Sequence, residues 1–553
     1  MKTKLFAFST LVSSVVLLTG CIGPASTPVN DSTNSGGNNA SADASKTLLT
    51  IGTFDGGFGT QWLSNAAKRF EEKYADQSFE AGKKGVVVRV DGQKDAYSGA
   101  QLLNKTLERD IYFTEQVSYF DFLNRGKMAD ISDVVKGSLS DFGESKTIED
   151  KMDPAFKSYL TAKDNKYYAV PFYDGFLGIV YDKDLFDQES FYLGMDGNII
   201  SDKDQEKSSG PDGVKGTSDD GLPATYTEFN QLLKAIRSAG MTPFSYAGGD
   251  ASQYPERAIL NFFATNEGKD AMNLNYTLNG TAKIADVAAD GSFTTTDTTI
   301  TEDNGYLLQK MPGKYQALQF MKDIMLGDAS NFDINAGSVS HMNAQTNFIA
   351  GYSKKRDQYA MLIDGSWWEN EASGAFASVE RLYGVKKIDR HFAWMPIPFA
   401  DPASVGQKKQ TYVSQNSSFG FVSANTAHLD LAKLFMKFIN TDAELSAFTA
   451  ETSTTRAMNY EVTASDQANL TSFAKSMCEL KKTADIVYPY SSLVKQINHP
   501  SDFSCDTWYW AATINHTDYT NPFLAFQENK ADARSYFLGS ADYHGASFWS
   551  NLK

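Results

Sequence analysis

The fold is decided by the stretch YYAVPFYDGFLGIVYDKDLF, residues 167–186. From Phe176 to Tyr181 this stretch is mostly apolar, and it becomes polar at Asp182. This pattern predicts a strand that ends in a turn. The neighbouring segments decide what kind of sheet the strand joins.

Strands and helices alternate along the rest of the chain. A strand is expected at 48–54, and apolar residues then repeat every four positions from Trp62 to Tyr74, which predicts a helix with one apolar face. Thr225 and Glu228 form a capping box at the start of another helix. Further strands are predicted at 86–90, 110–113, 360–365 and 419–423, further helices near 95–108 and 431–439, and a surface insertion at 277–305. The alternation predicts an α/β layer architecture with largely parallel strands.

The composition excludes several classes of protein. The chain has 553 residues, with 51 Lys and Arg against 67 Asp and Glu, and a net charge of −16. At roughly 100–200 residues per domain, this length allows about two to four domains. We expect no nucleic-acid partner, because so acidic a surface repels phosphate backbones. Three Cys exclude a disulfide-dense scaffold, whereas 27 Tyr, 37 Phe and 7 Trp supply many aromatic rings.

The N-terminus has the pattern of an export signal. Lys2 and Lys4 precede an apolar run at 5–18 that is too short to span a bilayer comfortably. The run ends in Leu18-Thr19-Gly20-Cys21, which resembles a bacterial lipobox. The resemblance implies that residues 1–20 are a signal peptide and that Cys21 receives acyl chains such as palmitate; an ordinary signal peptide is the alternative. Residues 21–46 are polar and small, which predicts a flexible tether to the outer face of the cell membrane.

Motifs of several enzyme classes are missing from the sequence. It contains no GxxxxGK[ST] phosphate loop, no GxSxG elbow and no HExxH, and the six His are scattered. Acidic pairs occur, but only the distance between two carboxyl groups would define a glycosidase pair. We therefore expect a protein that is not an enzyme.

Six segments, in order, resemble one family. This family is the extracellular solute-binding proteins of ABC importers, in the large carbohydrate-binding class related to maltose-binding protein. The segments are LLTIGTFDGGFGTQWLSNAAKRFEEKY (48–74), DIYFTEQVSYFDFLNRGKMADISD (110–133), YYAVPFYDGFLGIVYDKDLF (167–186), LPATYTEFNQLLKAI (222–236), AMLIDGSWWENEA (360–372) and LAKLFMKFINTDAELSAF (431–448).

The resemblance implies a two-lobe periplasmic-binding-protein-like fold of type II, with hinge crossings around a central ligand cleft. One lobe is expected at 47–173 and 412–455, and the other at 176–396 and 460–545. Ligands of open α/β sheets bind at the carboxyl ends of strands, and hinge closure is the expected motion. The implied partners are an oligosaccharide and the membrane subunits of an ABC permease, and we expect a monomer.

A sugar needs aromatic platforms and polar partners, and several residues are placed to supply them. In the resembling family the first Trp of the Gly-x-Trp motif stacks on a sugar, so one of the adjacent pair Trp367 and Trp368 is expected in the cleft and the other in the core. One of Trp508 and Trp510 is expected to face the same cleft. The remaining candidates are Asp55, Glu115, Tyr173, Asp174 and Arg456; Arg456 could instead pair with an Asp.

Two further features concern metal ions and disulfides. Asp212, Asp219 and Asp220 alternate with Gly in a loop that resembles Ca²⁺ loops of some large members of the family, which predicts a structural Ca²⁺ site or else a solvated acidic loop. No other cofactor is expected. Cys478 and Cys505 would lie outside the cytoplasm, where a disulfide between them is allowed and two free thiols are the alternative.

The predicted function is that of a lipid-anchored receptor that captures an oligosaccharide for import by an ABC transporter. A secreted lipoprotein enzyme that degrades polysaccharides is one alternative, and a binding protein for a solute other than sugar is another. The sequence leaves the identity of the sugar open, since linkage preference depends on side-chain geometry.

Overall fold

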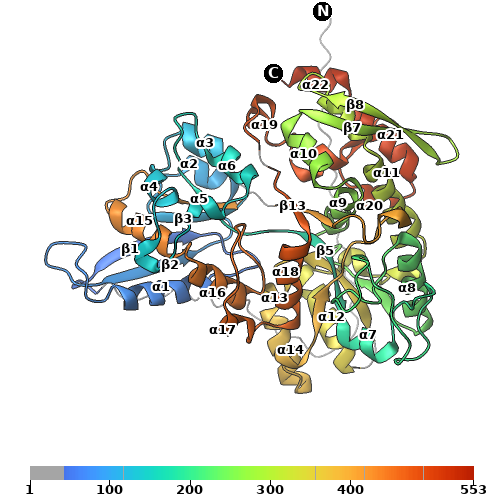
Figure 1. Ribbon diagram of the computed structural model, residues 1–553, viewed down its shortest axis with the longest axis horizontal. Coiled ribbons are helices and arrows are strands. Elements are labelled where there is room, and N and C mark those ends of the chain that lie inside the picture. Colours follow the sequence, from blue (N-terminus) through green and yellow to red (C-terminus); the bar gives the residue numbers. More distant parts are fainter. Residues whose placement is uncertain (1–42, 116–117, 355–356, 416–417, 490, 553) are drawn as a thin grey trace, which may run out of the picture. The chain divides into compact units, whose positions relative to one another are not determined.

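Five strands form the first sheet, in the order β2-β1-β3-β12-β4. Figure 1 labels β1, β2 and β3 of this sheet, in the part of the chain coloured blue to cyan. The computed structural model describes residues 43–115, 118–354, 357–415, 418–489 and 491–552, all within one compact unit. Strand β1 pairs in parallel with β2 and β3, whereas β12 runs antiparallel to β3 and β4. These strands are β1 (Thr47–Thr53), β2 (Val86–Gly92), β3 (Ile111–Glu115), β4 (Val170–Pro171) and β12 (Ser418–Val422).

Helix α1 (Gln61–Lys73) packs the predicted apolar face against this sheet. Trp62 meets the ring of Phe113 on β3 at 5.8 Å, and Phe70 meets Phe435 at 5.1 Å, both edge to face. Full burial of such a ring stabilises the fold by about 1.5–3 kcal/mol. The first lobe, as we call the part around this sheet, also contains α2 (Gly99–Asn104), α3 (Tyr119–Asn124), α4 (Ser132–Val135), α5 (Ile148–Lys151), α6 (Pro154–Leu160), α15 (Leu429–Phe438) and α16 (Asp442–Thr452).

Four strands form the second sheet, in the order β10-β5-β9-β6. They are β5 (Leu177–Asp182), β6 (Thr242–Ser245), β9 (Tyr359–Gly365) and β10 (Phe392–Trp394). The predicted capping box forms, since Thr225 accepts from the backbone of Glu228 and the Glu228 side chain accepts from Thr225 in turn. The second lobe, built around this sheet, contains α7 (Lys183–Glu189), α8 (Tyr226–Ser238), α9 (Tyr254–Glu267), α10 (Lys269–Thr277), α11 (Pro312–Gln319), α12 (His341–Lys354), α13 (Trp368–Glu371), α14 (Ser373–Tyr383) and α18 (Ser472–Thr483).

The prediction of largely parallel strands is wrong for the second sheet. Strand β5 runs antiparallel to both β9 and β10. Its first residue, Leu177, pairs with Gly365 at the carboxyl end of β9, because the chain arrives there from the first lobe. Strand β12 enters the first sheet in the same way, with Ser418 paired to Glu115 at the end of β3. A strand that enters at the carboxyl end of its neighbours must run against them.

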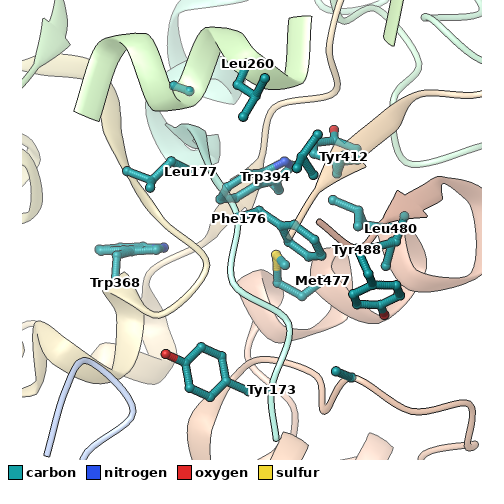
Figure 2. Packing of buried hydrophobic residues seen from close by; sticks show 14 of the residues in the cluster. Tyr173, Phe176, Leu177, Leu260, Trp368, Trp394, Tyr412, Met477, Leu480 and Tyr488 are labelled. Atoms are coloured by element: carbon teal, nitrogen blue, oxygen red, sulfur yellow. The ribbon is translucent and has the colours of Figure 1, made fainter. Parts of the chain in front are cut away.

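The segments that connect the lobes share an aromatic core. Phe176 lies 5.8 Å from Tyr412, which lies 6.3 Å from Trp394, all as ring centroids. Figure 2 shows these side chains and Met477 gathered beside the connecting segment that carries Tyr173. The small parallel sheet of β11 (Thr411–Val413) and β13 (Asp485–Val487) adjoins this core.

The expected surface insertion is an antiparallel hairpin of β7 (Gly280–Val287) and β8 (Phe293–Ile300). The C-terminal part adds α17 (Ala464–Gln467), α19 (Val494–Asn498), β14 (Ala512–Ile514), β15 (Thr517–Tyr519), α20 (Pro522–Gln527), α21 (Ala533–Tyr543) and α22 (Ala546–Asn551). Among the described residues, no helix combines the length and apolar composition that crossing a membrane requires. The predicted signal peptide, Cys21 and the tether up to residue 42 lie outside the described ranges.

The disulfide between Cys478 and Cys505 is not formed, since both residues are free thiols. Cys478 lies on α18, whereas Cys505 begins the π-helical turn Cys505–Tyr509, and the two residues line different cavities. Burial raises the pKa of Cys478 to about 11 and that of Cys505 to about 12, which disfavours the thiolate form of both.

Candidate ligand cleft

Residues from both lobes line a cavity of about 330 Å³, which we call the first cavity. It lies at the carboxyl ends of strands: Phe54 follows β1, Glu115 ends β3, and Trp367 follows β9. Ligands of open α/β sheets bind at such edges. The other lining residues are Gly56, Gly57, Phe58, Lys94, Tyr173, Asp250, Ala251, Gln253, Tyr254, Arg257, His341 and Glu371.

Aromatic rings make up much of the wall. The half-buried Trp367 meets Phe58 of the first lobe at 6.3 Å and Tyr254 of the second lobe at 6.5 Å, both edge to face. Phe58 also packs on Tyr173 at 4.3 Å. These four rings form an aromatic surface that both lobes share.

Two glycines let the backbone approach the indole of Trp367. A Cβ atom on Gly57 would lie 2.3 Å from Cδ1 of Trp367, and one on Gly365 would lie 2.3 Å from its Cε2. Any larger residue would therefore displace the ring. Close by, Asn370 Nδ2 donates a 2.9 Å hydrogen bond to the carbonyl oxygen of Gly57, which ties the first lobe's loop to the second lobe.

Acidic groups and their partners supply the polar part of the wall. His341 Nδ1 lies 2.8 Å from Asp250 Oδ2. Behind the cavity, Gln345 Nε2 donates to Glu371 Oε2 at 2.8 Å and to Asp364 Oδ2 at 3.1 Å. Burial and the neighbouring Glu371 raise the pKa of Asp364 well above its usual range. Carboxylate oxygens here can accept from hydroxyl groups of a solute, and Arg257 and Lys94 can donate.

Three of the predicted site residues line the first cavity: Glu115, Tyr173 and Trp367. The Tyr173 hydroxyl donates a short hydrogen bond to Glu115. Asp55 sits between two lining residues, but its Cβ lies beside Gly92, and burial raises the pKa of its carboxyl. Its side chain therefore faces the end of β2.

The other predicted tryptophans are fully buried. Trp368 packs edge to face on Phe392 at 5.1 Å and on Phe473 at 5.6 Å, so the adjacent pair places one ring at the cavity and one in the core. Trp508 donates from Nε1 to Asn275 Oδ1 at 2.9 Å, and Trp510 is equally buried. Neither of these late tryptophans lines the first cavity, because the segment that carries them packs inside the second lobe.

Asp174 and Arg456 hold the connecting segments together instead of reaching the cavity. Asp174 is 0% exposed and accepts from Tyr488 at 2.8 Å, from Thr455 at 3.0 Å, and from Lys481. Arg456 is also 0% exposed and donates to the Phe172 carbonyl and to Asn440 Oδ1. The expected partner of Arg456, an Asp, is thus replaced by a carbonyl and an amide.

The acidic loop does not gather its carboxylates into a Ca²⁺ site. Asp219 accepts from the backbone of Asp212 and from the Thr217 hydroxyl, and Asp220 accepts from the backbone of Gly216. Asp212 and Asp219 line a cavity that Lys408 and Lys409 also line. The positive charges of these two lysines repel a metal cation from the cavity. Within the described ranges, no three His, Cys, Asp or Glu side chains converge as metal ligands.

Several lining residues were not predicted from the sequence. Tyr254 and Arg257 come from the start of α9 and Asp250 from the turn before it, and this stretch carries no motif of the resembling family. In the sequence, Tyr254 and Arg257 are marked only as an aromatic and a basic residue within one helical turn of each other, after Gly248-Gly249. This pattern is too common to predict a binding site. His341 begins α12 and Glu371 ends α13, and the two residues line the same cavity only because the fold brings these helices together.

Two α/β lobes, connected through segments that pack on one another around a cavity at the strand ends, define a two-lobe binding-protein fold. The sequence matches the family "Bacterial extracellular solute-binding protein" over residues 60–444. The chain belongs to this family. No curated protein sequence matches the chain.

Solved structures share the fold at low sequence identity. The GacH receptor of Streptomyces glaucescens, studied unliganded and with acarbose, aligns with a TM-score of 0.52 and 14% identity over 92% of this chain and 100% of its own. Apo RafE from Streptococcus pneumoniae aligns with a TM-score of 0.51 and 16% identity over 92% and 99%. Lmo0181 from Listeria monocytogenes, in complex with cycloalternan, gives 0.50 and 13% over 91% and 99%.

The adjacent tryptophans are expected to respond differently to truncation. Trp367→Ala should lower solute affinity by about 30- to 1000-fold, because losing an aromatic ring in a desolvated site commonly costs about 2–4 kcal/mol. Trp368→Ala should lower the free energy of unfolding by about 3–5 kcal/mol, because it empties a core site. Calorimetric titration and urea unfolding of both variants measure the two effects. A stability loss for Trp367→Ala as large as that for Trp368→Ala, with affinity kept, would make Trp367 a packing residue.

Chelation is expected to leave the melting temperature unchanged. A cation bound only to the folded state would stabilise it by mass action. The carboxylates of Asp212, Asp219 and Asp220 instead bind the backbone of their own loop. Melting is compared in excess EDTA and in millimolar CaCl₂, for the wild type and for Asp219→Asn. A rise with Ca²⁺ that Asp219→Asn abolishes would restore the calcium hypothesis.

Proposed function

We propose that this protein is the extracellular receptor of an ABC importer and that its ligand is an oligosaccharide. The observation that carries the proposal is the first cavity, where aromatic rings and carboxylates from both lobes line one space. A sugar ring has apolar C–H faces bordered by hydroxyl groups. Trp367, Tyr254 and Phe58 suit the faces, and Glu115, Asp250 and Glu371 suit the hydroxyls.

Proteins of the same fold bind sugars. GacH was solved with acarbose, RafE with raffinose and Lmo0181 with cycloalternan. At identities of 13–17% these relatives support the fold directly and the ligand class only by analogy. The analogy agrees with the chemistry of the first cavity, which is the independent support.

Capture and release require the lobes to move. We propose that residues 47–173 with 412–455 and residues 176–396 with 460–545 close on the ligand about the connecting segments, and that permease subunits recognise the closed form. The receptor needs no cofactor for this task. It would act as a monomer at the outer face of the membrane, anchored through acyl chains on Cys21.

Binding without turnover is the expected result with the correct sugar. The mature protein is titrated with malto-, xylo- and galacto-oligosaccharides, and the sugars are then recovered and analysed by chromatography. We expect one class to raise the melting temperature and to be recovered intact, since ligand bound to the folded state stabilises it. Shortened sugar would identify an enzyme, and a peptide or polyamine that binds when every sugar fails would identify another solute class.

Anchoring is tested separately with Cys21→Ala. This variant should appear in the culture medium with an unchanged melting temperature, because it lacks the sulfur that would carry an acyl chain, and the polar composition of residues 22–46 predicts a tether without core residues. A Ser26→Ala variant, in the same tether, serves as the control and should remain with the cells. A Cys21→Ala protein that still sediments with membranes would contradict the lipoprotein assignment.

A further inference from the structure

A second cavity, of about 490 Å³, adjoins the first. Arg257 lines both cavities, so the two spaces meet at its side chain. Like the first cavity, the second takes residues from both lobes: Phe120 and Tyr159 come from the first lobe, and Tyr276 and Phe503 from the second. Its volume lies within the range of about 300–1,000 Å³ that small-molecule sites span.

Aromatic rings from both lobes line the second cavity. Phe120 and Tyr159 of the first lobe meet edge to face at 5.2 Å, and both are partly exposed. In the second lobe, the partly exposed Phe503 packs on the buried ring of Trp508 at 4.9 Å. In the segment that carries Trp508 and Trp510, Phe503 is therefore the ring that lines the cavity, and Trp508 packs behind it.

Polar groups in the second cavity include two amide acceptors. The Oε1 atoms of Gln415 and Gln496 are buried and have no hydrogen-bond partner among the residues that the structure describes. Gln415 is held by its Nε2, which donates to the Arg257 carbonyl at 2.7 Å. A buried acceptor without a donor is unfavourable, so a ligand hydroxyl that donates to it gains more than it would in water.

The ion pair of Arg257 and Asp506 lies where the cavities meet. Arg257 Nε donates to Asp506 Oδ1 at 2.7 Å and Nη2 donates to Oδ2 at 2.5 Å. This fork leaves Nη1 outside the contact, and the side chains of Arg257 and Asp506 keep 26% and 32% exposure. A ligand that passes over the pair therefore meets a donor held in a fixed orientation.

We propose that the second cavity continues the ligand site, so that the receptor binds a linear chain of several sugar units running from Trp367 past Arg257 to Phe503. The proposal rests on the proposed function and adds the length of the ligand to it. The wall formed by Pro489, Gln496 and Phe503 lies beyond residues 60–444, the segment shared with the family. The C-terminal part of the chain would therefore contribute part of the wall that sets the preferred length.

The test uses the full mature protein and a ladder of one sugar type, from disaccharide to hexasaccharide, taken from the malto-, xylo- and galacto-oligosaccharide series. We expect affinity to rise by about 10-fold or more between the short and the long members. Phe503→Ala and Phe120→Ala, which change residues from different lobes, should each lower affinity for the long members by about 10- to 100-fold and for the disaccharide by less than about 2-fold. Tyr383→Ala, on the exposed end of α14, is the matched control and should change neither.

The outcomes separate this inference from the proposed function. Affinity that is independent of length, with both variants like wild type, would overturn the second cavity as a subsite and leave an oligosaccharide receptor with one short site. An equal loss at every length would also overturn it, because the changed residues would then act on the first cavity. If no ladder binds, the proposed function fails and this inference fails with it.

Discussion

The buried carboxylate of Asp174 holds together the segments that connect the two lobes. It accepts from Thr455, from Tyr488 and from Lys481 of α18, so residues far apart in the sequence meet at one charge. A carboxylate with no exposed surface is tolerated only when it is paired and fully hydrogen-bonded. Its neighbour Tyr173 points the other way, toward the first cavity and Glu115. One dipeptide therefore contributes both to the contacts between the connecting segments and to the wall of the first cavity.

The same connecting segments determine the direction of the strands. Where a connecting segment enters a lobe beside the cavity, it starts a strand, β5 or β12, at the carboxyl end of the neighbouring strand. Strand β5 therefore runs antiparallel to β9, and β12 runs antiparallel to β3. The parallel strands β1, β3 and β9 end at the cavity and place Phe54, Glu115 and Trp367 there. The topology therefore also positions the first cavity, since the edge at which the chain changes lobes is the edge at which these side chains converge.

The aromatic and the acidic side chains of the first cavity are held in position by different kinds of contact. The rings of Phe58, Tyr173 and Trp367 are held by packing and by glycine backbone contacts, which leave little freedom of position. The carboxylates are held by partners, as Asp250 is by His341 and Glu371 by Gln345. Rigid faces and oriented acceptors lower the entropy lost when a flexible ligand binds. The second cavity has the same combination, and there the Oε1 atoms of Gln415 and Gln496 have no donor within the described ranges.

The sequence by itself determined the elements and the family. Four-residue periodicity located α1, the capping box located α8, and the ordered motifs identified a solute-binding protein, because these signals are local and survive low identity. It also singled out Glu115 and Trp367 after strands and Tyr173 where the chain crosses between the lobes, and all three line the first cavity. Only the tertiary structure decided which Trp is exposed, that Asp174 and Arg456 turn inward, that both thiols stay free, and that α9 supplies Tyr254 and Arg257. Those outcomes depend on contacts between segments more than a hundred residues apart, and the spacing of residues along the chain carries no record of such contacts.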